Sequence, residues 1–193
     1  MSIVKAHTIS EQEYLAGELH SNIKHEYIGG QVYAMAGVSK NHERITGNIF
    51  RHFGNHLEGS PCEPFASDLK VKAGADFFYP DVMVVCDDQT TDEYYTEYPV
   101  ILVEVLSKST RKTDHSIKRM AYLKIPTLRE YVLIEQDFVD VEVVRKSQNW
   151  QSFHYFLGDE VTFESIDLTL SVEAIYQRVQ NSDVIEFLHR KDN

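Results

Sequence analysis

The sequence has almost no cysteine: Cys62 and Cys86 are the only two among 193 residues. They lie far apart in the chain, and neither stands in the paired spacing of a zinc site. A disulfide framework, which is typical of small secreted domains with many cysteines, is not indicated either. We therefore expect both side chains to be reduced thiols.

Long apolar runs are also missing. No stretch of about eighteen apolar residues could span a bilayer, and the hydrophobic share of 42% and the charged share of 25% are ordinary for a globular chain. The segment from Met1 to Ser10 lacks the basic region and the apolar core of a secretory signal. We therefore expect a soluble, cytoplasmic protein with no membrane partner.

Positive charge is scarce as well, because 19 Lys and Arg residues face 30 Asp and Glu residues and the formal net charge is -11. This balance argues against a nucleic-acid partner, whose phosphates favour clustered cations. A local basic strip can still coexist with an acidic remainder. The basic residues that cluster in sequence are Lys108, Arg111, Lys112, Lys118, Arg119 and Lys124. Such a cluster is more often a solvated helix face than a binding strip.

The first third of the chain carries three clear local patterns. Residues 10–19 begin with Ser and have Glu three positions later, a capping-box pattern that predicts a short helix. The pair Gly29-Gly30 lies between two β-prone runs and predicts a tight hairpin. Over residues 41–57 apolar side chains recur every four positions, which predicts a helix packed on the core.

Three segments rich in β-branched and aromatic residues predict the centre of a sheet. They cover residues 62–73, 77–86 and 99–107. Further strands are expected between residues 130 and 157, and a last helix from Ser171 to about Val179. This order predicts an α/β (α+β) fold in which helices flank a mixed sheet, built as one domain over residues 1–193.

A further helix is expected after the third of these segments. Ser109 or Thr110 can cap its start, and Pro126 ends it. Its apolar positions at helical spacing, which we expect to face the core, are Ile117, Met120 and Ala121.

Glu104 is the most informative single position, because it interrupts the apolar run PVILVEVL. A strand of this composition reads as buried on both faces, and a buried carboxylate costs several kcal/mol unless a cation compensates it. A metal ion would do so, and the alternatives are a buried pair with Arg or a strand end that emerges into water. Side chains alternate along a strand, so Glu104 shares its face with Leu102 and Leu106.

Asp81 follows Pro80 and precedes the run VMVV, where a strand begins or resumes after a bend. An Asp in this position is usually a turn residue. If its strand neighbours that of Glu104, however, the two carboxylates can converge on one hard cation such as Mg²⁺.

Several segments in the same order resemble the Uma-type family of proposed endonucleases, which belongs to the PD-(D/E)xK restriction-endonuclease-like superfamily. The resemblance covers the chain from Ile9 to about Val179, and any one segment alone would be weak. The segments are HEYIGGQVYAMAG, a helix opened by His42, SDLKV, YPDVMVV, VEVLSKST, a helix with Asp114, Lys118 and Tyr122, and REYVLI.

The resemblance assigns roles to particular residues. The proline-aspartate pair of the superfamily falls on Pro80 and Asp81, and its second acidic residue falls on Glu104. The lysine of the E-x-K pattern is absent, because Leu106 occupies its place. The Uma-type pattern implies that this lysine has moved to the following helix, where Lys118 fits. The alternative for Lys118 is an exposed ion pair with Asp114, one helical turn away.

Other polar residues keep two interpretations each. Glu26 is a further acidic ligand or general acid-base group in the superfamily pattern, or a charge at a hairpin edge. Asp68 faces the same site or water, and His42 is more readily a helix-start residue than a ligand. Two hydroxyl residues, Ser107 and Thr110, hold a phosphate or cap the helix that carries Lys118.

Together these residues predict a DNA phosphodiesterase that uses Mg²⁺ or Mn²⁺, held by Asp81, Glu104 and the carbonyl of Val105. Lys118 would orient water or stabilise the developing charge. The alternative is a catalytically silent module of the same fold that binds nucleic acid or protein, favoured by Leu106 and by the acidic charge. We also consider a homodimer, although no motif specifies the oligomeric state.

Overall fold

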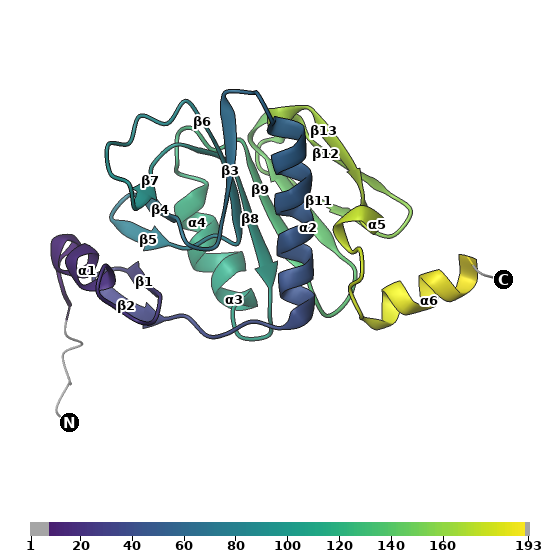
Figure 1. Ribbon diagram of the computed structural model, residues 1–193, viewed down its shortest axis with the longest axis horizontal. Helices are drawn as coiled ribbons and strands as arrows, with labels where there is room; N and C mark the ends of the chain where they lie inside the picture. The colour runs from purple at the N-terminus through teal and green to yellow at the C-terminus, as the bar shows by residue number, and fades with distance from the viewer. Residues whose placement is uncertain (1–7, 192–193) are drawn as a thin grey trace.

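The computed structural model describes residues 8–191 (Figure 1). Most of the segment from Met1 to Ser10, in which we expected no secretory signal, lies outside the described residues. Among the helices of the described chain, none is long and apolar enough to cross a lipid bilayer.

A six-stranded mixed sheet forms the centre of the structure, in the order β11-β10-β9-β8-β6-β3. The parallel pair is β8 with β9, and every other neighbouring pair is antiparallel. All eight residues of β8 are buried, as its apolar composition requires. The strands are β3 (Cys62–Ala66), β6 (Val82–Cys86), β8 (Pro99–Leu106), β9 (Glu130–Glu135), β10 (Val141–Arg145) and β11 (Ser152–Tyr155).

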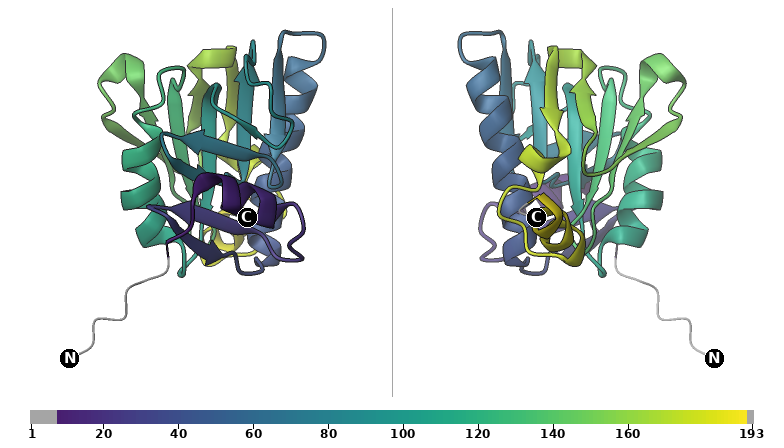
Figure 2. Two further views of the ribbon diagram at one scale, coloured as in Figure 1. Left: turned by 90° about the vertical axis from the view of Figure 1, so that its left-hand side faces the viewer. Right: turned by 90° about the vertical axis from the view of Figure 1, so that its right-hand side faces the viewer.

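A smaller five-stranded sheet, ordered β2-β1-β5-β4-β7, lies beside one end of the central sheet (Figure 2). Its β1-β2 hairpin turns at Gly29 and Gly30, whose φ angles of 57° and 84° confirm the predicted turn. The strands are β1 (His25–Ile28), β2 (Gln31–Ala34), β4 (Lys70–Ala73), β5 (Asp76–Phe78) and β7 (Tyr95–Thr96). A separate two-stranded ribbon, β12 (Glu160–Phe163) with β13 (Leu168–Ser171), was not expected from the sequence.

Helices cover both faces of the central sheet (Figure 2). On one face α2 (Lys40–Leu57) packs Ile45, Ile49 and Phe53 against Val103 of β8 within one apolar cluster. On the other face the chain runs through α3 (Arg111–Thr113), the π-helical turn η1 (Asp114–Lys118) and α4 (Arg119–Tyr122). The mixed sheet flanked by helices is therefore confirmed.

The remaining helical elements are peripheral. The predicted capping box is present, since Ser10 and Glu13 bond each other reciprocally at the start of α1. The last expected helix ends at Ile175 rather than near Val179, and α6 follows it unexpectedly. These elements are α1 (Glu11–Glu18), α5 (Val172–Ile175), α6 (Ser182–Lys191) and the 3-10 turns η2 (Lys146–Gln148) and η3 (Glu164–Ile166).

The expected packing side of the helix after β8 is wrong for two of its three residues. Ile117 and Met120 are 42% and 62% exposed, whereas Ala121 packs against the apolar cluster and Asp114, Lys118 and Tyr122 are buried. These three buried residues recur every four positions and form one stripe along the helical segment. The polar face of this segment is the one that meets the sheet.

The expectation of two reduced thiols is also wrong, because Cys62 and Cys86 form a disulfide. Their positions explain the bond. Cys62 begins β3, Cys86 ends β6, and the two residues are directly opposite each other in the antiparallel ladder. Sequence spacing does not reveal such a register. Since cytosolic thiols are usually kept reduced, the location expected from the sequence stays a prediction.

Reduction of this disulfide is expected to lower the free energy of unfolding by about 3 kcal/mol, because the bond closes a loop of 24 residues in the unfolded chain. Urea unfolding with and without reductant measures the loss. The double variant Cys62→Ser/Cys86→Ser serves as control and should not respond to reductant. Two alkylatable thiols in the native, untreated protein would contradict the bond.

Candidate functional site

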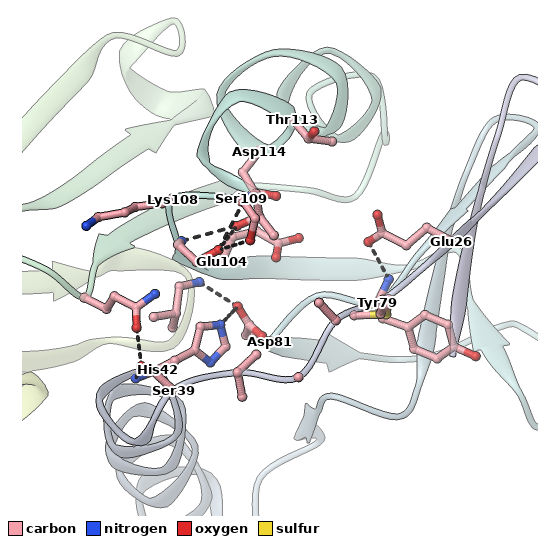
Figure 3. Close-up of a pocket in the computed structure, with 18 of the residues that line it drawn as sticks. Glu26, Ser39, His42, Tyr79, Asp81, Glu104, Lys108, Ser109, Thr113 and Asp114 are labelled. Carbon is pink, nitrogen blue, oxygen red and sulfur yellow. Dashed lines mark hydrogen bonds and ion pairs between the residues drawn. The ribbon is translucent and has the colours of Figure 1, made fainter. Parts of the chain in front are cut away.

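A pocket of about 590 Å³ opens at one end of the central sheet (Figure 3). Its walls are Glu26 of β1, the stretch from β2 into the first turn of α2, the segment before β6 that carries Asp81, the stretch from the end of β8 through η1, and Gln136 with Asp137 after β9. Four carboxylate residues and one lysine of interest line it, namely Glu26, Asp81, Glu104, Asp114 and Lys118. The pocket thus gathers residues from five separate parts of the chain.

Neighbouring strands bring Asp81 and Glu104 to this pocket. Asp81 immediately precedes β6, and β6 pairs with β8 through Val82 opposite Val103. The same antiparallel ladder therefore places Asp81 across from Glu104, as expected for adjacent strands. Glu104 is only 3% exposed, so the apolar run correctly indicated a buried carboxylate. Whether the two carboxylates share one ion stays a prediction.

The carboxylate of Asp81 is held through one of its oxygens. The backbone N–H of Val105 donates to Oδ2 at 2.7 Å, and Nε2 of His42 lies 3.3 Å from the same oxygen. Within the described chain, Oδ1 of Asp81 makes no hydrogen bond or ion pair. Figure 3 shows this carboxylate between the His42 ring and the Glu104 strand. One oxygen of Asp81 is therefore left for a ligand.

His42 is both a helix-start residue and a site residue. Its backbone N–H donates to the N-cap hydroxyl of Ser39 at 3.2 Å, which fixes the first turn of α2. Burial acts to lower the pKa of His42, but the hydrogen bond and charge of Asp81 outweigh it, and the pKa is raised above its ordinary value. Sequence reasoning identified only the capping part of this role.

Lys118 is the centre of a buried ionic cluster. Its Nζ lies 2.8 Å from Oε1 of Glu26, 3.1 Å from Oε1 of Glu104 and 3.3 Å from Oδ1 of Asp114, and the residue is 5% exposed. The interpretation of Lys118 as an exposed partner of Asp114 alone is therefore wrong. The hairpin-edge interpretation of Glu26 is wrong as well, since this residue is buried.

The surroundings of Glu104 shift its pKa upward. Burial raises its pKa well above the ordinary value, the charge of Lys118 opposes this, and the carboxylates of Asp114 and Asp81 add to the rise. The hydroxyl of Tyr122 donates to Oε1 of Glu104 at 2.8 Å. Burial also acts to lower the pKa of Lys118, but the surrounding carboxylates raise it well above its ordinary value. The Lys118 ammonium is therefore held in its charged form, while the negative charges of Asp114 and Asp81 disfavour a further negative charge on Glu104.

Several sequence candidates lie outside this cluster. Leu106 is buried among apolar side chains, so it leaves the E-x-K lysine position without a charge. Asp68 pairs with Lys24 at 2.9 Å and faces solvent. Thr110 stands at the N-cap of α3 without a capping bond from its own side chain. Oγ of Ser107 instead accepts a hydrogen bond from the backbone N–H of Thr110 at 3.2 Å, so Ser107 caps the turn that leads into this helix.

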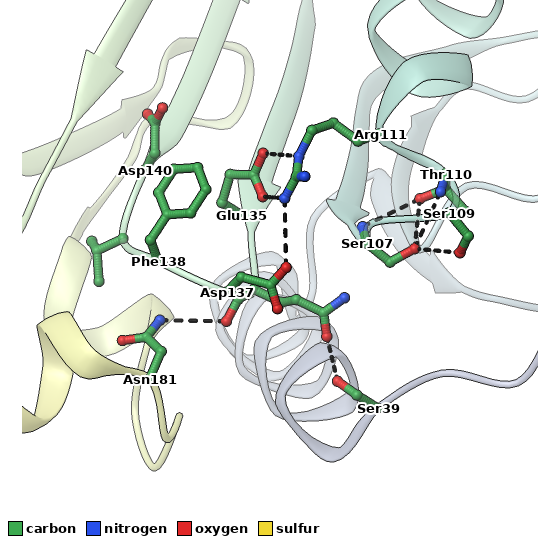
Figure 4. Close-up of polar contacts among 12 residues, drawn as sticks. Ser39, Ser107, Ser109, Thr110, Arg111, Glu135, Asp137, Phe138, Asp140 and Asn181 are labelled. Carbon is green, nitrogen blue, oxygen red and sulfur yellow. Dashed lines mark hydrogen bonds and ion pairs between the residues drawn. The ribbon is translucent and has the colours of Figure 1, made fainter.

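Half of the basic sequence cluster is neutralised by ion pairs, so it does not form one continuous basic strip. Besides the buried Lys118, Arg111 donates to both oxygens of Glu135 at 2.6 and 2.5 Å, and Arg119 donates to Glu142 at 2.8 Å. Figure 4 shows Arg111 reaching from the loop after β8 to the end of β9. This pair ties the pocket loop to the central sheet.

The raised pKa of Glu104 predicts a pH dependence of stability. The folded protein holds this proton at pH values where the unfolded chain has lost it, so the stabilising contribution is full below about 4.5 and is lost as pH rises through the folded-state pKa. With chelator present, Glu104→Gln is expected to remove this loss and to unfold less readily than wild type at neutral pH. Urea unfolding from pH 5 to 8 measures it.

Glu142→Gln is the matched control, because Glu142 is also buried but its pKa is lowered. Burial acts to raise that pKa, and the bonds from Ser152 and Arg119 outweigh it. The stability that the charged Glu142 carboxylate contributes is lost only as pH falls. Glu142→Gln should therefore have a lower free energy of unfolding than wild type at neutral pH. An identical pH profile for wild type and Glu104→Gln would contradict the assignment.

Comparison with known proteins identifies relatives over most of the chain. An uncharacterised protein of Synechocystis is 38% identical over 175 residues, which cover 88% of this chain and 92% of the relative. A second uncharacterised Synechocystis protein is 34% identical over 151 residues, covering 76% and 85%. Neither name states an activity.

A solved structure from Anabaena variabilis, described as a "putative nuclease belonging to DUF820", has the same fold. The TM-score is 0.75 over 89% of this chain and 99% of that chain, with 20% sequence identity. The Uma2 family model, described as "Putative restriction endonuclease", matches residues 11–173. The chain belongs to the Uma2 family, as the order of its sequence motifs predicted.

Proposed function

We propose that this protein hydrolyses DNA phosphodiester bonds with the help of a divalent metal ion. The observation that carries the proposal is an excess of negative charge in the pocket. Five carboxylates line it, from Glu26, Asp81, Glu104, Asp114 and Asp137, with two lysines, Lys108 and the buried Lys118. Buried charge without compensation is costly, and a divalent cation would supply what Lys118 cannot.

The residues present fit a hard cation. Asp81, Glu104 and the carbonyl of Val105 would supply oxygen ligands from adjacent strands, the type that Mg²⁺ and Mn²⁺ prefer. Within residues 8–191, no three side chains of His, Cys, Asp and Glu converge into a metal-binding group. The ion would therefore take few protein ligands and keep several waters, as Mg²⁺ commonly does. A substrate phosphate could replace some of these waters on the ion.

The chemistry can be divided between the ion and the protein. A bound Mg²⁺ or Mn²⁺ would polarise the phosphodiester and lower the pKa of water. Val105 and His42 hold Oδ2 of Asp81, so its other oxygen points at the pocket in a fixed orientation. Glu104 is oriented by the hydroxyl of Tyr122. Both carboxylates are therefore preorganised rather than free to rotate.

Lys118 fits the role of the migrated lysine. An ammonium has three donors, and three carboxylates lie within 3.3 Å of this one. Nζ donates a hydrogen bond to Oε1 of Glu104, whereas Oδ1 of Asp114 has no hydrogen-bond partner in the described chain. The donor on the Asp114 side would therefore be the one to orient water or to contact a phosphate oxygen.

The family supports the choice of substrate. The Uma2 model is described as "Putative restriction endonuclease", and the Anabaena structure as a "putative nuclease". The silent-module alternative rested on the acidic net charge and on Leu106, which cannot act as a base or a cation. An ammonium 3.1 Å from Glu104 weakens that alternative, since Lys118 provides the charge that Leu106 lacks.

Asp81→Asn and Glu104→Gln are each expected to abolish Mn²⁺ binding, because each removes one proposed ligand charge, while the fold is retained. His42→Ala should weaken Mn²⁺ binding by about 10- to 100-fold, since it releases the Asp81 carboxylate. Calorimetric titration measures affinity, and thermal melts report folding.

His56→Ala is the matched control for His42→Ala, because His56 lies on the same helix but bonds the carbonyl of Ile166, away from the pocket. It should bind Mn²⁺ like wild type. Unchanged affinity in both Asp81→Asn and Glu104→Gln would place any bound ion elsewhere.

Lys118→Ala is expected to reduce cleavage of plasmid DNA by about 100- to 1,000-fold and to keep Mn²⁺ affinity, the signature of a lost charge-stabilising donor. Asp114→Ala, assayed beside it, removes the neighbouring carboxylate and keeps the lysine. If Lys118→Ala does not fold, Lys118→Arg retains the charge but not the compact ammonium. Wild-type cleavage by folded Lys118→Ala would refute the migrated-lysine assignment, as would Lys118→Arg if it cleaved no better than a Lys118→Met variant that is folded and cleaves at the wild-type rate.

A further inference from the structure

Tyr33 stands beside the candidate centre. It lies on β2 directly opposite Glu26 of β1 in the antiparallel ladder. Residues directly opposite in such a ladder project to the same face and are close neighbours. The carboxylate of Glu26 is 2.8 Å from Lys118, so the same face carries the Tyr33 ring toward the pocket that Tyr33 also lines.

The ring of Tyr33 is held but not covered. Its hydroxyl donates to Oε1 of Gln31 at 2.6 Å, two residues earlier on the same strand. Tyr33 is nevertheless 47% exposed, and Val38, further along the same wall, is 50% exposed. The connection from β2 to α2 thus presents an open aromatic and apolar wall within reach of the carboxylates.

The pocket offers little cationic surface. Among its lining residues the lysines are Lys108 and Lys118, and Lys118 is committed to three carboxylates. Lys108 is the one lining lysine without an ion pair in the described part of the chain. Duplex DNA is normally bound through many simultaneous contacts between basic side chains and phosphates. One unpaired lysine, on a chain of formal net charge -11, does not supply that many contacts.

Unpaired strands are bound by a different balance of forces. Their bases stack on exposed aromatic side chains, and each stacked base adds about 1–3 kcal/mol of binding free energy that depends little on sequence. We propose that Tyr33 is a stacking platform for an unpaired base next to the scissile phosphate, so that the substrate is single-stranded or locally opened DNA. This inference rests on the proposed nuclease function.

A second copy of the chain is the rival occupant of this wall. β2 is an edge strand of the five-stranded sheet, and Val32 is exposed on it. Edge strands with exposed apolar residues can pair between chains. The formal net charge of -11 opposes a second copy and the phosphates of a nucleic acid alike, so charge does not choose between them. The place of Tyr33 in the lining of the pocket favours the nucleobase.

The test measures binding of a phosphorothioate oligothymidine of about 16 nucleotides, a length within the range of single-strand sites, in Mg²⁺. The same strand annealed to its complement is the duplex probe. We expect tighter binding of the single strand, and a loss of about 5- to 150-fold in Tyr33→Leu, the range for one stacked base. Tyr33→Phe keeps the ring and should bind like wild type.

A 2-aminopurine base in the strand provides a direct stacking signal. Its fluorescence should be quenched on binding to wild type and Tyr33→Phe, and not by Tyr33→Leu. Phe153→Ala is the matched control, because Phe153 is a 39% exposed aromatic on the edge strand β11 outside the pocket. This variant should bind and quench normally.

The outcomes separate the two proposals. Equal binding by wild type and Tyr33→Leu, or a preference for the duplex probe, overturns the stacking platform and leaves the nuclease function standing. Changed sedimentation of Tyr33→Leu with unchanged affinity assigns the wall to a contact between copies and also overturns it. If the wild type binds neither probe and cleaves no DNA, the proposed function fails as well.

Discussion

The ammonium of Lys118 is the interaction on which the rest of the site depends. It joins Glu26 of the β1-β2 hairpin, Glu104 of the central strand β8 and Asp114 of the π turn. These three elements belong to the small sheet, the central sheet and its covering helices. Without that charge, three buried carboxylates would face one another, so one side chain fixes both the geometry of the pocket and its electrostatics.

The pocket therefore contains more acidic than basic side chains. Lys118 stabilises the carboxylates enough for the fold to form, but the pKa of Glu104 remains well above its ordinary value because burial and the neighbouring carboxylates outweigh the ammonium. Asp81 is held from one side by Val105 and His42, which leaves its second oxygen directed to the pocket. A divalent cation would complete this balance, and Tyr33 would add a contact for the substrate beside it.

The sequence predicted the parts of this site that depend on strand periodicity. Glu104 interrupts an apolar run, and Pro80 with Asp81 marks the start of the neighbouring strand, so both positions follow from local pattern. The burial of Glu26 and Asp114 could not be predicted in this way. Asp114 and Lys118 are four positions apart, a spacing that fits a surface ion pair equally well, and only the packing of this segment against the sheet buries them. The disulfide likewise depends on a ladder register between distant segments.

The central claim is that Asp81 and Glu104 hold one divalent ion. A crystal of the protein grown with Mn²⁺ tests it most directly, through the anomalous scattering of the metal. The account predicts a single strong peak in contact with Oδ1 of Asp81, the Glu104 carboxylate and the Val105 carbonyl, and its loss in Glu104→Gln. A peak away from these residues, or a fully ordered pocket without one at saturating Mn²⁺, would contradict the account.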